Sequence, residues 1–236
     1  MVLKQLATLR GHVGVVWSVV WSPNNGENLA SCGEDRSVVV WRPVESASNG
    51  EWLAAVKCSG AFFPRTLRSL CWGPLRQNFA VGGFDGLVTL LEVGERRTAA
   101  GTEGGEMEMR LDAKGSLEGH ENEVKCVAFS PSGSMLASCA RDKTVWLWED
   151  GMDDGDFECA GLLPGHSADV KHIAWHPQRD DVIVSSSYDN TIRVWQEDID
   201  AEEFLTVAVL SGHGSTVWAT SFNQRGTRLA SVSDDK

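Results

Sequence analysis

Residues 117–149 read LEGHENEVKCVAFSPSGSMLASCARDKTVWLWE, and they form the most regular copy of a unit that recurs along the chain. The unit begins with the pair Gly119 and His120, continues with an alternating apolar run over 124–129, and turns at the sequence SPSG. A strand of small residues follows, then a tight turn at Asp142 and a last strand that ends at Trp148. Alternation bounded by turn residues predicts short antiparallel strands.

Four markers keep their register from copy to copy. In each complete copy Asp follows Ser by four residues and Trp follows Asp by six. A Gly-His start and a Trp-Asp-type end, at a period of roughly 40–45 residues, are typical of a four-stranded β-propeller blade. The markers are His12, Ser31, Asp35 and Trp41; His120, Ser138, Asp142 and Trp148; His166, Ser185, Asp189 and Trp195; and His213, Ser231 and Asp235. The sequence therefore predicts an all-β, WD-repeat β-propeller.

We expect one domain, 1–236, made of five repeats. The second repeat is degenerate, because Asp85 is retained while Phe63, Val81 and Leu91 occupy the His, Ser and Trp positions. Replacing all three polar members together leaves no buried partner unsatisfied. Gly-rich, charged residues follow, with no strand pattern after Val93 until at best 107–111, and predict a flexible surface insertion or a stretch that relatives lack. The expected repeats are about 3–42, 52–93, 116–149, 157–196 and 204–236, with the insertion at 94–115.

Repeats of this kind usually build seven blades, and this chain supplies about five. In a closed ring the strand near residues 4–9 would complete the last blade, but the last repeat stops before its Trp. We therefore expect an unclosed propeller and a truncated sequence, with unpaired strand edges at both ends. A natural five-bladed form is the alternative.

Composition excludes several classes of function. The net charge of −12 disfavours direct binding to nucleic acid or to an anionic membrane. No apolar run has the length of a membrane span, and the N-terminus lacks the features of a signal peptide, which predicts a cytoplasmic or nuclear location. None of the six cysteines forms a CxxC pair, so we expect buried thiols and no metal site or cofactor.

The recurring His, Ser and Asp invite comparison with hydrolases. An enzyme needs one activated nucleophile with an oxyanion site, whereas this set recurs around a ring. A buried hydrogen-bond relay among Trp, Ser, His and Asp is the simpler interpretation. The sequence therefore predicts a structural set and no enzyme.

Three positions in each repeat are predicted to point to one end of the ring. Together they bring a basic cluster and aromatic side chains to that end, which predicts a pocket for an acidic or C-terminal carboxylate segment with an aromatic side chain. Scattered surface charge is the alternative. The predicted partner-binding residues are Arg68, Lys125, Arg141, Lys171, Trp17, Trp218, Tyr188 and Phe84.

The opposite end is acidic. These loops are interpreted as solvating, with a second partner as the alternative. The acidic residues are Asp153, Asp154, Asp156 and Glu158 after one Trp, and Glu197, Asp198, Asp200, Glu202 and Glu203 after the next.

The motifs ENEVK, CARDK, DFEC, DVKH and SYDNTI together resemble the WD-repeat protein of cytosolic iron–sulfur cluster assembly, the Ciao family. The resemblance covers the first repeat and 116–236 and is weak over 43–115. It implies a seven-bladed, non-catalytic scaffold in the targeting complex that delivers 4Fe–4S clusters to apo-proteins of cytosol and nucleus, with no cluster ligands of its own.

The partners that the resemblance implies are the other subunits of this complex, the iron-only-hydrogenase-like cluster carrier and client apo-proteins. Arg141 matches the CxRDK motif and Lys125 the EVK motif, so both are candidate partner contacts. The alternative is a generic WD-repeat adaptor, such as a substrate receptor of a ubiquitin ligase.

Overall fold

The computed structural model describes residues 3–23, 26–44, 51–60, 62–74, 78–97, 107–151 and 156–236. Within these ranges all regular structure is β-strand, and no helix is long and apolar enough to span a membrane. The strands form four antiparallel four-stranded sheets and one two-stranded sheet. The sheets are, in chain order, β1 (Val16–Trp21), β2 (Leu29–Gly33), β3 (Ser37–Pro43) and β4 (Trp52–Ser59); β5 (Leu67–Trp72), β6 (Asn78–Gly83), β7 (Val88–Arg97) and β8 (Met107–Leu117); β9 (Val124–Phe129), β10 (Met135–Ala140), β11 (Val145–Asp150) and β12 (Phe157–Leu163); β13 (Val170–Trp175), β14 (Val182–Ser187), β15 (Thr191–Asp198) and β16 (Glu203–Ser211); and β17 (Val217–Phe222) with β18 (Leu229–Ser233).

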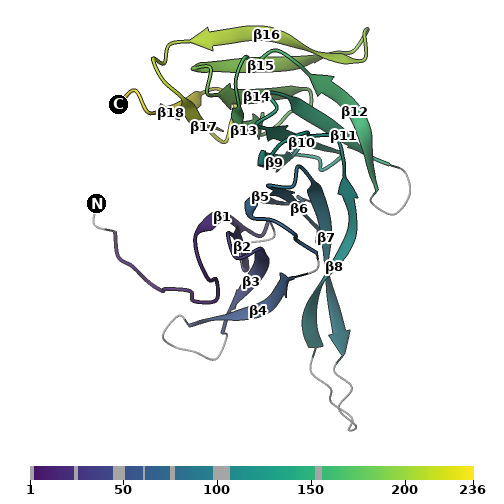
Figure 1. Ribbon diagram of the computed structural model, residues 1–236, viewed down its shortest axis with the longest axis vertical. Coiled ribbons are helices and arrows are strands. Elements are labelled where there is room, and N and C mark those ends of the chain that lie inside the picture. Colours follow the sequence, from purple (N-terminus) through teal and green to yellow (C-terminus); the bar gives the residue numbers. More distant parts are fainter. Residues whose placement is uncertain are drawn as a thin grey trace.

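The sheets are arranged as the blades of an open arc (Figure 1). Their innermost strands β1, β5, β9, β13 and β17 are neighbours in that order. The first sheet and the β17–β18 pair lie at the two ends of the arc, so the propeller is unclosed over the described residues, as the sequence predicts.

The core lies between the sheets. The second strand of each of the first four sheets carries small or β-branched residues and is almost wholly buried, because a neighbouring sheet covers it. Ala137, Ser138 and Cys139 of β10 are each 0% exposed. Small side chains there let two sheets approach to packing distance, and larger ones such as Phe79 and Ile183 fill the space between them.

Neighbouring inner strands are also joined by side-chain hydrogen bonds at one repeated position. The third residue of each inner strand bonds to the backbone of the fourth residue of the next. We call these bonds the inner latches. They are Ser18 Oγ to Leu70 O (3.5 Å), Val127 N to Ser69 Oγ (3.1 Å), Cys126 Sγ to Ile173 O (3.7 Å) and Thr220 N to His172 Nδ1 (3.4 Å).

The structure differs from the prediction that no strand follows Val93 within the insertion at 94–115, except at best over 107–111. Strand β7 continues to Arg97 and β8 begins at Met107, and the hairpin projects beyond the other sheets (Figure 1). Opposite charges across the strands, such as Arg96 beside Glu108 (3.8 Å), support a ribbon that buries neither face at its tip. Such a ribbon lacks the apolar alternation on which the prediction relied. Residues 98–106, and the predicted acidic-loop residues Asp153 and Asp154, lie outside the described residues.

Candidate functional site

The polar markers of the third repeat form a continuous relay. His120 Nδ1 lies 2.7 Å from Asp142 Oδ2, its Nε2 lies 2.8 Å from Ser138 Oγ, and Trp148 Nε1 lies 2.9 Å from the same Oγ. Because a carboxylate only accepts, Nδ1 carries the proton and donates it to Asp142. Nε2 then accepts from the Ser138 hydroxyl, which in turn accepts from the indole N–H.

The same contacts recur in three other repeats. The His–Asp, His–Ser and Trp–Ser distances are 2.9, 2.8 and 2.8 Å in the first repeat, and 2.8 Å each in the fourth. In the fifth repeat His213 lies 2.8 Å from Asp235 and 2.7 Å from Ser231. Each Asp also accepts a backbone N–H from the residue after its His, which closes the loop onto the turn.

A hydroxyl two residues after the Asp was missed in the sequence. Thr191 Oγ1 donates to Asp189 Oδ1 at 2.6 Å, and Thr144 and Ser37 do the same in their repeats. Burial raises the pKa of Asp189, but the hydrogen bonds from Thr191 and His166 outweigh this and lower it to about 2. The signal was visible as Asp-x-Ser/Thr in three repeats.

The second repeat replaces the relay with packing. Phe63, Val81 and Leu91 are at most 1% exposed and belong to one apolar cluster. Asp85 keeps its turn, where its Oδ1 accepts the N–H of Leu87 at 3.1 Å. No polar member of a relay is therefore left without partners among the described residues of this repeat.

The relay serines of the third and fourth repeats are poor candidates for nucleophiles. Ser138 and Ser185 are each 0% exposed, and each hydroxyl already contacts both a His and a Trp. A substrate has no route to a hydroxyl that is buried beneath its own base. The geometry of these sets suits a structural role.

The structure brings the predicted basic and aromatic residues together at one end of the sheets, at the starts of the inner strands and in the turns that follow β6, β10 and β14. Arg68 Cζ lies 4.8 Å from the ring centre of Trp17, and Lys125 Nζ lies 4.8 Å from that of Phe84. Each cation comes from one repeat and its ring from the preceding one. These distances are within the range of cation–π attraction.

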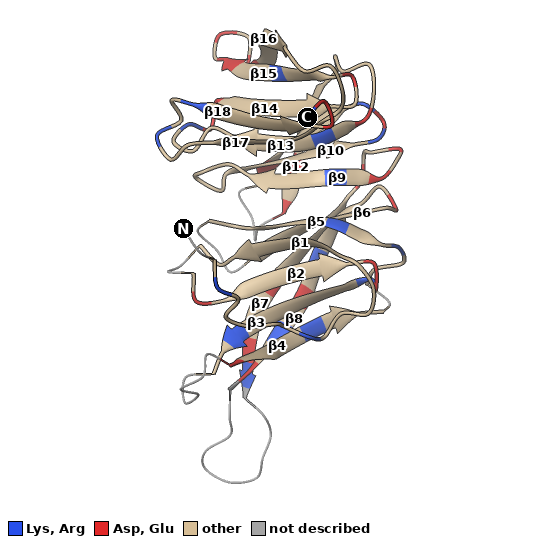
Figure 2. Ribbon diagram, turned by 90° about the vertical axis from the view of Figure 1, so that its left-hand side faces the viewer, with Lys and Arg blue, Asp and Glu red and all other residues tan. Residues whose placement is uncertain are grey.

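Lys171 lies at the other end of this row of cation–ring contacts. Its Nζ lies 4.0 Å from the ring centre of Tyr188 and 5.5 Å from that of Trp218. The two rings meet edge to face at 5.9 Å. Figure 2 shows basic segments on β5 and β9 near the same end of the sheets. We call Arg68, Lys125, Arg141, Lys171, Trp17, Trp218, Tyr188 and Phe84 the basic–aromatic surface.

Carboxylates are interleaved with these cations. Arg141 Nη1 lies 3.3 Å from Glu123 Oε1, and Lys171 Nζ lies 3.0 Å from Asp169 Oδ2. The side chain of Arg141 is 58% exposed, whereas that of Lys171 is only 10% exposed. Arg141 is therefore much the more available of the two for a partner.

Electrostatic coupling joins Arg141 to the rest of the surface. Burial lowers the pKa of Lys125, and the charges of Lys171 and Arg68 lower it further, against the opposing effect of Glu123. Burial raises the pKa of Glu123, but a backbone N–H and the charges of Lys125 and Arg141 outweigh this and lower it. The four cations thus form one electrostatic unit with two embedded carboxylates. Their role in partner binding stays a prediction.

The fold and these repeats define a class of protein. The model of the family "WD domain, G-beta repeat" matches residues 3–42, 112–149, 157–196 and 204–236, which is more than half of the chain. The chain therefore belongs to the WD-repeat family. Strands β5, β6 and most of β7–β8 lie outside these matches, although they form a complete four-stranded sheet.

Individual relatives point to one branch of this family, as the sequence motifs predict. The "Probable cytosolic iron-sulfur protein assembly protein 1" of Sclerotinia sclerotiorum is 34% identical over 227 residues, which cover 77% of this chain and 48% of that protein. Its counterpart in Kluyveromyces lactis is 37% identical over 147 residues, 62% of this chain and 40% of the other. A "Probable cytosolic Fe-S cluster assembly factor" of Schizosaccharomyces japonicus is 40% identical over 142 residues, 60% of this chain and 20% of the other. The chain spans about half, or less, of the length of these relatives.

Proposed function

We propose that this chain is a non-catalytic scaffold of cytosolic iron–sulfur protein assembly, which mediates delivery of 4Fe–4S clusters to apo-proteins through protein–protein contacts. The names of its relatives support the pathway. Its partners are the other subunits of the targeting complex, the iron-only-hydrogenase-like carrier and client apo-proteins, in the cytoplasm and nucleus.

The basic–aromatic surface is the observation that carries the proposal. A row of four cations on a chain of net charge −12 gives an acidic partner one favourable place to dock. Trp17, Tyr188 and Trp218 are 40–47% exposed and supply apolar anchors beside the cations. An acidic segment with an aromatic side chain fits this combination.

Four of the six cysteines are buried as predicted, whereas Cys71 is partly exposed and Cys159 is exposed, contrary to the prediction. Within the described part of the chain, no group of three or more His, Cys, Asp or Glu residues is arranged to hold a metal ion. Burial raises the pKa of the Cys32 thiol to about 12, and Cys126 and Cys139 are raised for the same reason. Protonated, buried thiols are poor ligands. We propose that the cluster is cargo that partner proteins carry.

Affinity capture with Arg141→Glu tests the proposal. The matched control is Arg225→Glu, which makes the same charge change at an exposed residue on the turn between β17 and β18. We expect iron–sulfur assembly factors to co-purify with wild type and with the control but not with Arg141→Glu. Recovery of ubiquitin-ligase subunits alone would favour the generic adaptor, and equal losses with both variants would reject this surface.

A further inference from the structure

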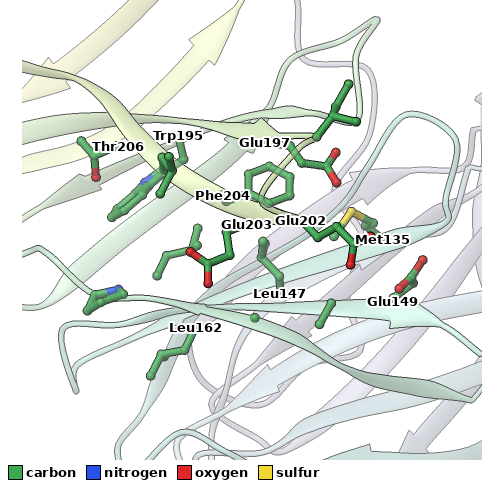
Figure 3. A pocket seen from close by; sticks show the side chains of 16 residues that line it. Met135, Leu147, Glu149, Leu162, Trp195, Glu197, Glu202, Glu203, Phe204 and Thr206 are labelled. Carbon is green, nitrogen blue, oxygen red and sulfur yellow. The ribbon is translucent and has the colours of Figure 1, made fainter.

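A groove separates the third and fourth sheets on their outer side. One wall is formed by β10, β11 and β12, and the other by β15 and β16 (Figure 3). The groove encloses about 1030 Å³. It lies between two complete four-stranded sheets, so its walls are fully formed within this chain.

The floor of the groove is apolar. Leu147, Leu163 and Trp195 are at most 4% exposed and form its base, and Phe204 packs against Trp175 of the same cluster (centroids 6.1 Å apart). Figure 3 shows Phe204 on the β16 wall and Leu147 and Leu162 on the opposite side. Leu162 remains 46% exposed. Large apolar side chains thus continue from the base to the lip.

The rim is acidic. Four carboxylates line the rim and come from both walls of the groove. In the described part of the chain none of these four carboxylates forms an ion pair. Glu158 lies directly opposite Glu149 across the β11–β12 pair and adds to the negative charge of the rim. Among the described residues that line the groove there is no Lys, Arg or His. The rim carboxylates are Glu149, Glu197, Glu202 and Glu203.

Charge and shape together define what this groove accepts. Unpaired carboxylates repel acidic peptides and phosphate groups, and they attract Lys and Arg. The apolar base gains most from a large aliphatic or aromatic side chain that excludes water. We propose that the groove binds a segment of a partner protein in which Lys or Arg residues flank one large apolar side chain.

In this arrangement the apolar side chain rests on Leu147, Trp195 and Phe204. The flanking cations meet Glu149 on one wall and Glu197 on the other. The site is separate from the basic–aromatic surface and has the opposite charge preference. One chain can therefore hold an acidic and a basic partner at the same time.

Selection from a random peptide library tests the proposal, because the groove itself then chooses the sequence. Random dodecapeptides displayed on phage are selected on the whole chain. The recovered peptides are then synthesised and titrated by fluorescence anisotropy. The groove variant is Glu149→Lys/Glu197→Lys, and the matched control is Glu95→Lys/Glu118→Lys, which makes the same charge change at exposed residues away from the groove. Circular dichroism and melting curves verify that each variant is folded.

We expect a class of peptides with Lys or Arg around one large apolar residue. Their affinity falls at least about tenfold in the groove variant and is unchanged in the control, since only the former reverses charges that face the ligand. Leu162→Asp, at a half-exposed residue of the lip, also weakens them. Arg141→Glu leaves them bound, which separates this site from the proposed function.

Three outcomes overturn the proposal. The first is that no basic, apolar class of peptide is enriched. The second is that the control weakens such peptides as much as the groove variant does, which indicates attraction by overall charge. The third is that Arg141→Glu abolishes their binding while the groove variant does not.

Discussion

His172 closes the latch between β13 and β17 only while its ring is neutral. Its Nδ1 accepts the backbone N–H of Thr220 at 3.4 Å, and a protonated ring has no acceptor to offer. Burial and, to a smaller extent, the positive charge of Arg68 together lower the pKa of His172 from its ordinary 6.5 to about 4. Acidification is therefore the perturbation that tests the latch.

The sign and size of the effect follow from these two values. Between pH 6.5 and pH 4 the unfolded chain binds a proton at this residue and the folded chain does not. The contribution of His172 to stability is thus fully present above pH 6.5 and is lost as the pH falls to about 4. A difference of this size between the folded and unfolded pKa corresponds to up to about 3 kcal/mol.

Urea denaturation, followed by tryptophan fluorescence at intervals from pH 7.5 to pH 4, measures this contribution. The comparison variant is His172→Asn, because the side-chain oxygen of Asn takes the place of Nδ1 as an acceptor but does not titrate. We expect the free energy of unfolding of wild type to fall by about 2–3 kcal/mol more than that of the variant over this range. Other groups, including His166, titrate in both proteins and cancel. Parallel pH profiles for the two proteins would refute the reasoning.

Three substitutions test the relay, its apolar replacement and the packing of the sheets. Asp142→Ala leaves the Nδ1–H of His120 without its acceptor, so we expect a loss of about 1–3 kcal/mol and a lower melting temperature; unchanged melting would count against a stabilising relay. Phe63→His places an imidazole in an apolar cluster, and we expect a loss of at least about 2 kcal/mol in urea denaturation, whereas a gain in stability would show that a relay can form there. Gly82→Ala puts a Cβ 2.5 Å from Cγ1 of Val124, and we expect about 1–3 kcal/mol of destabilisation by the same assay; wild-type stability would mean that the sheets separate freely.

The sequence predicts the contacts within one repeated unit better than it predicts which neighbouring side chains bind each surface residue. The relay contacts lie where the spacing of His, Ser, Asp and Trp places them, because each set belongs to one loop and one turn of a repeated unit. The neutralising contact between Glu123 and Arg141 was not foreseen, since spacing shows where a side chain points and not how strongly its neighbour binds it. The extension of the β7–β8 hairpin was missed because charged residues that pair across its strands replace the apolar alternation by which strands are recognised in a sequence.

The groove between the third and fourth sheets could not be predicted from the sequence for a different reason. Glu197, Glu202 and Glu203 were visible as loop charges, but the base combines Leu147 of one repeat with Trp195 and Phe204 of the two repeats that follow it. Such a surface exists only once two sheets stand side by side. Repeat-by-repeat comparison therefore identifies the parts of each sheet and leaves the spaces between sheets undetermined.

The replacement of the relay by Phe63, Val81 and Leu91 has a consequence for temperature. The attraction between apolar side chains weakens on cooling. The second sheet lacks the polar relay of its neighbours and depends more heavily on that attraction. Near 0 °C we expect amide hydrogen exchange to accelerate first in β5 and β6. On cooling, the arc would then lose structure first at its second sheet and not at its two ends.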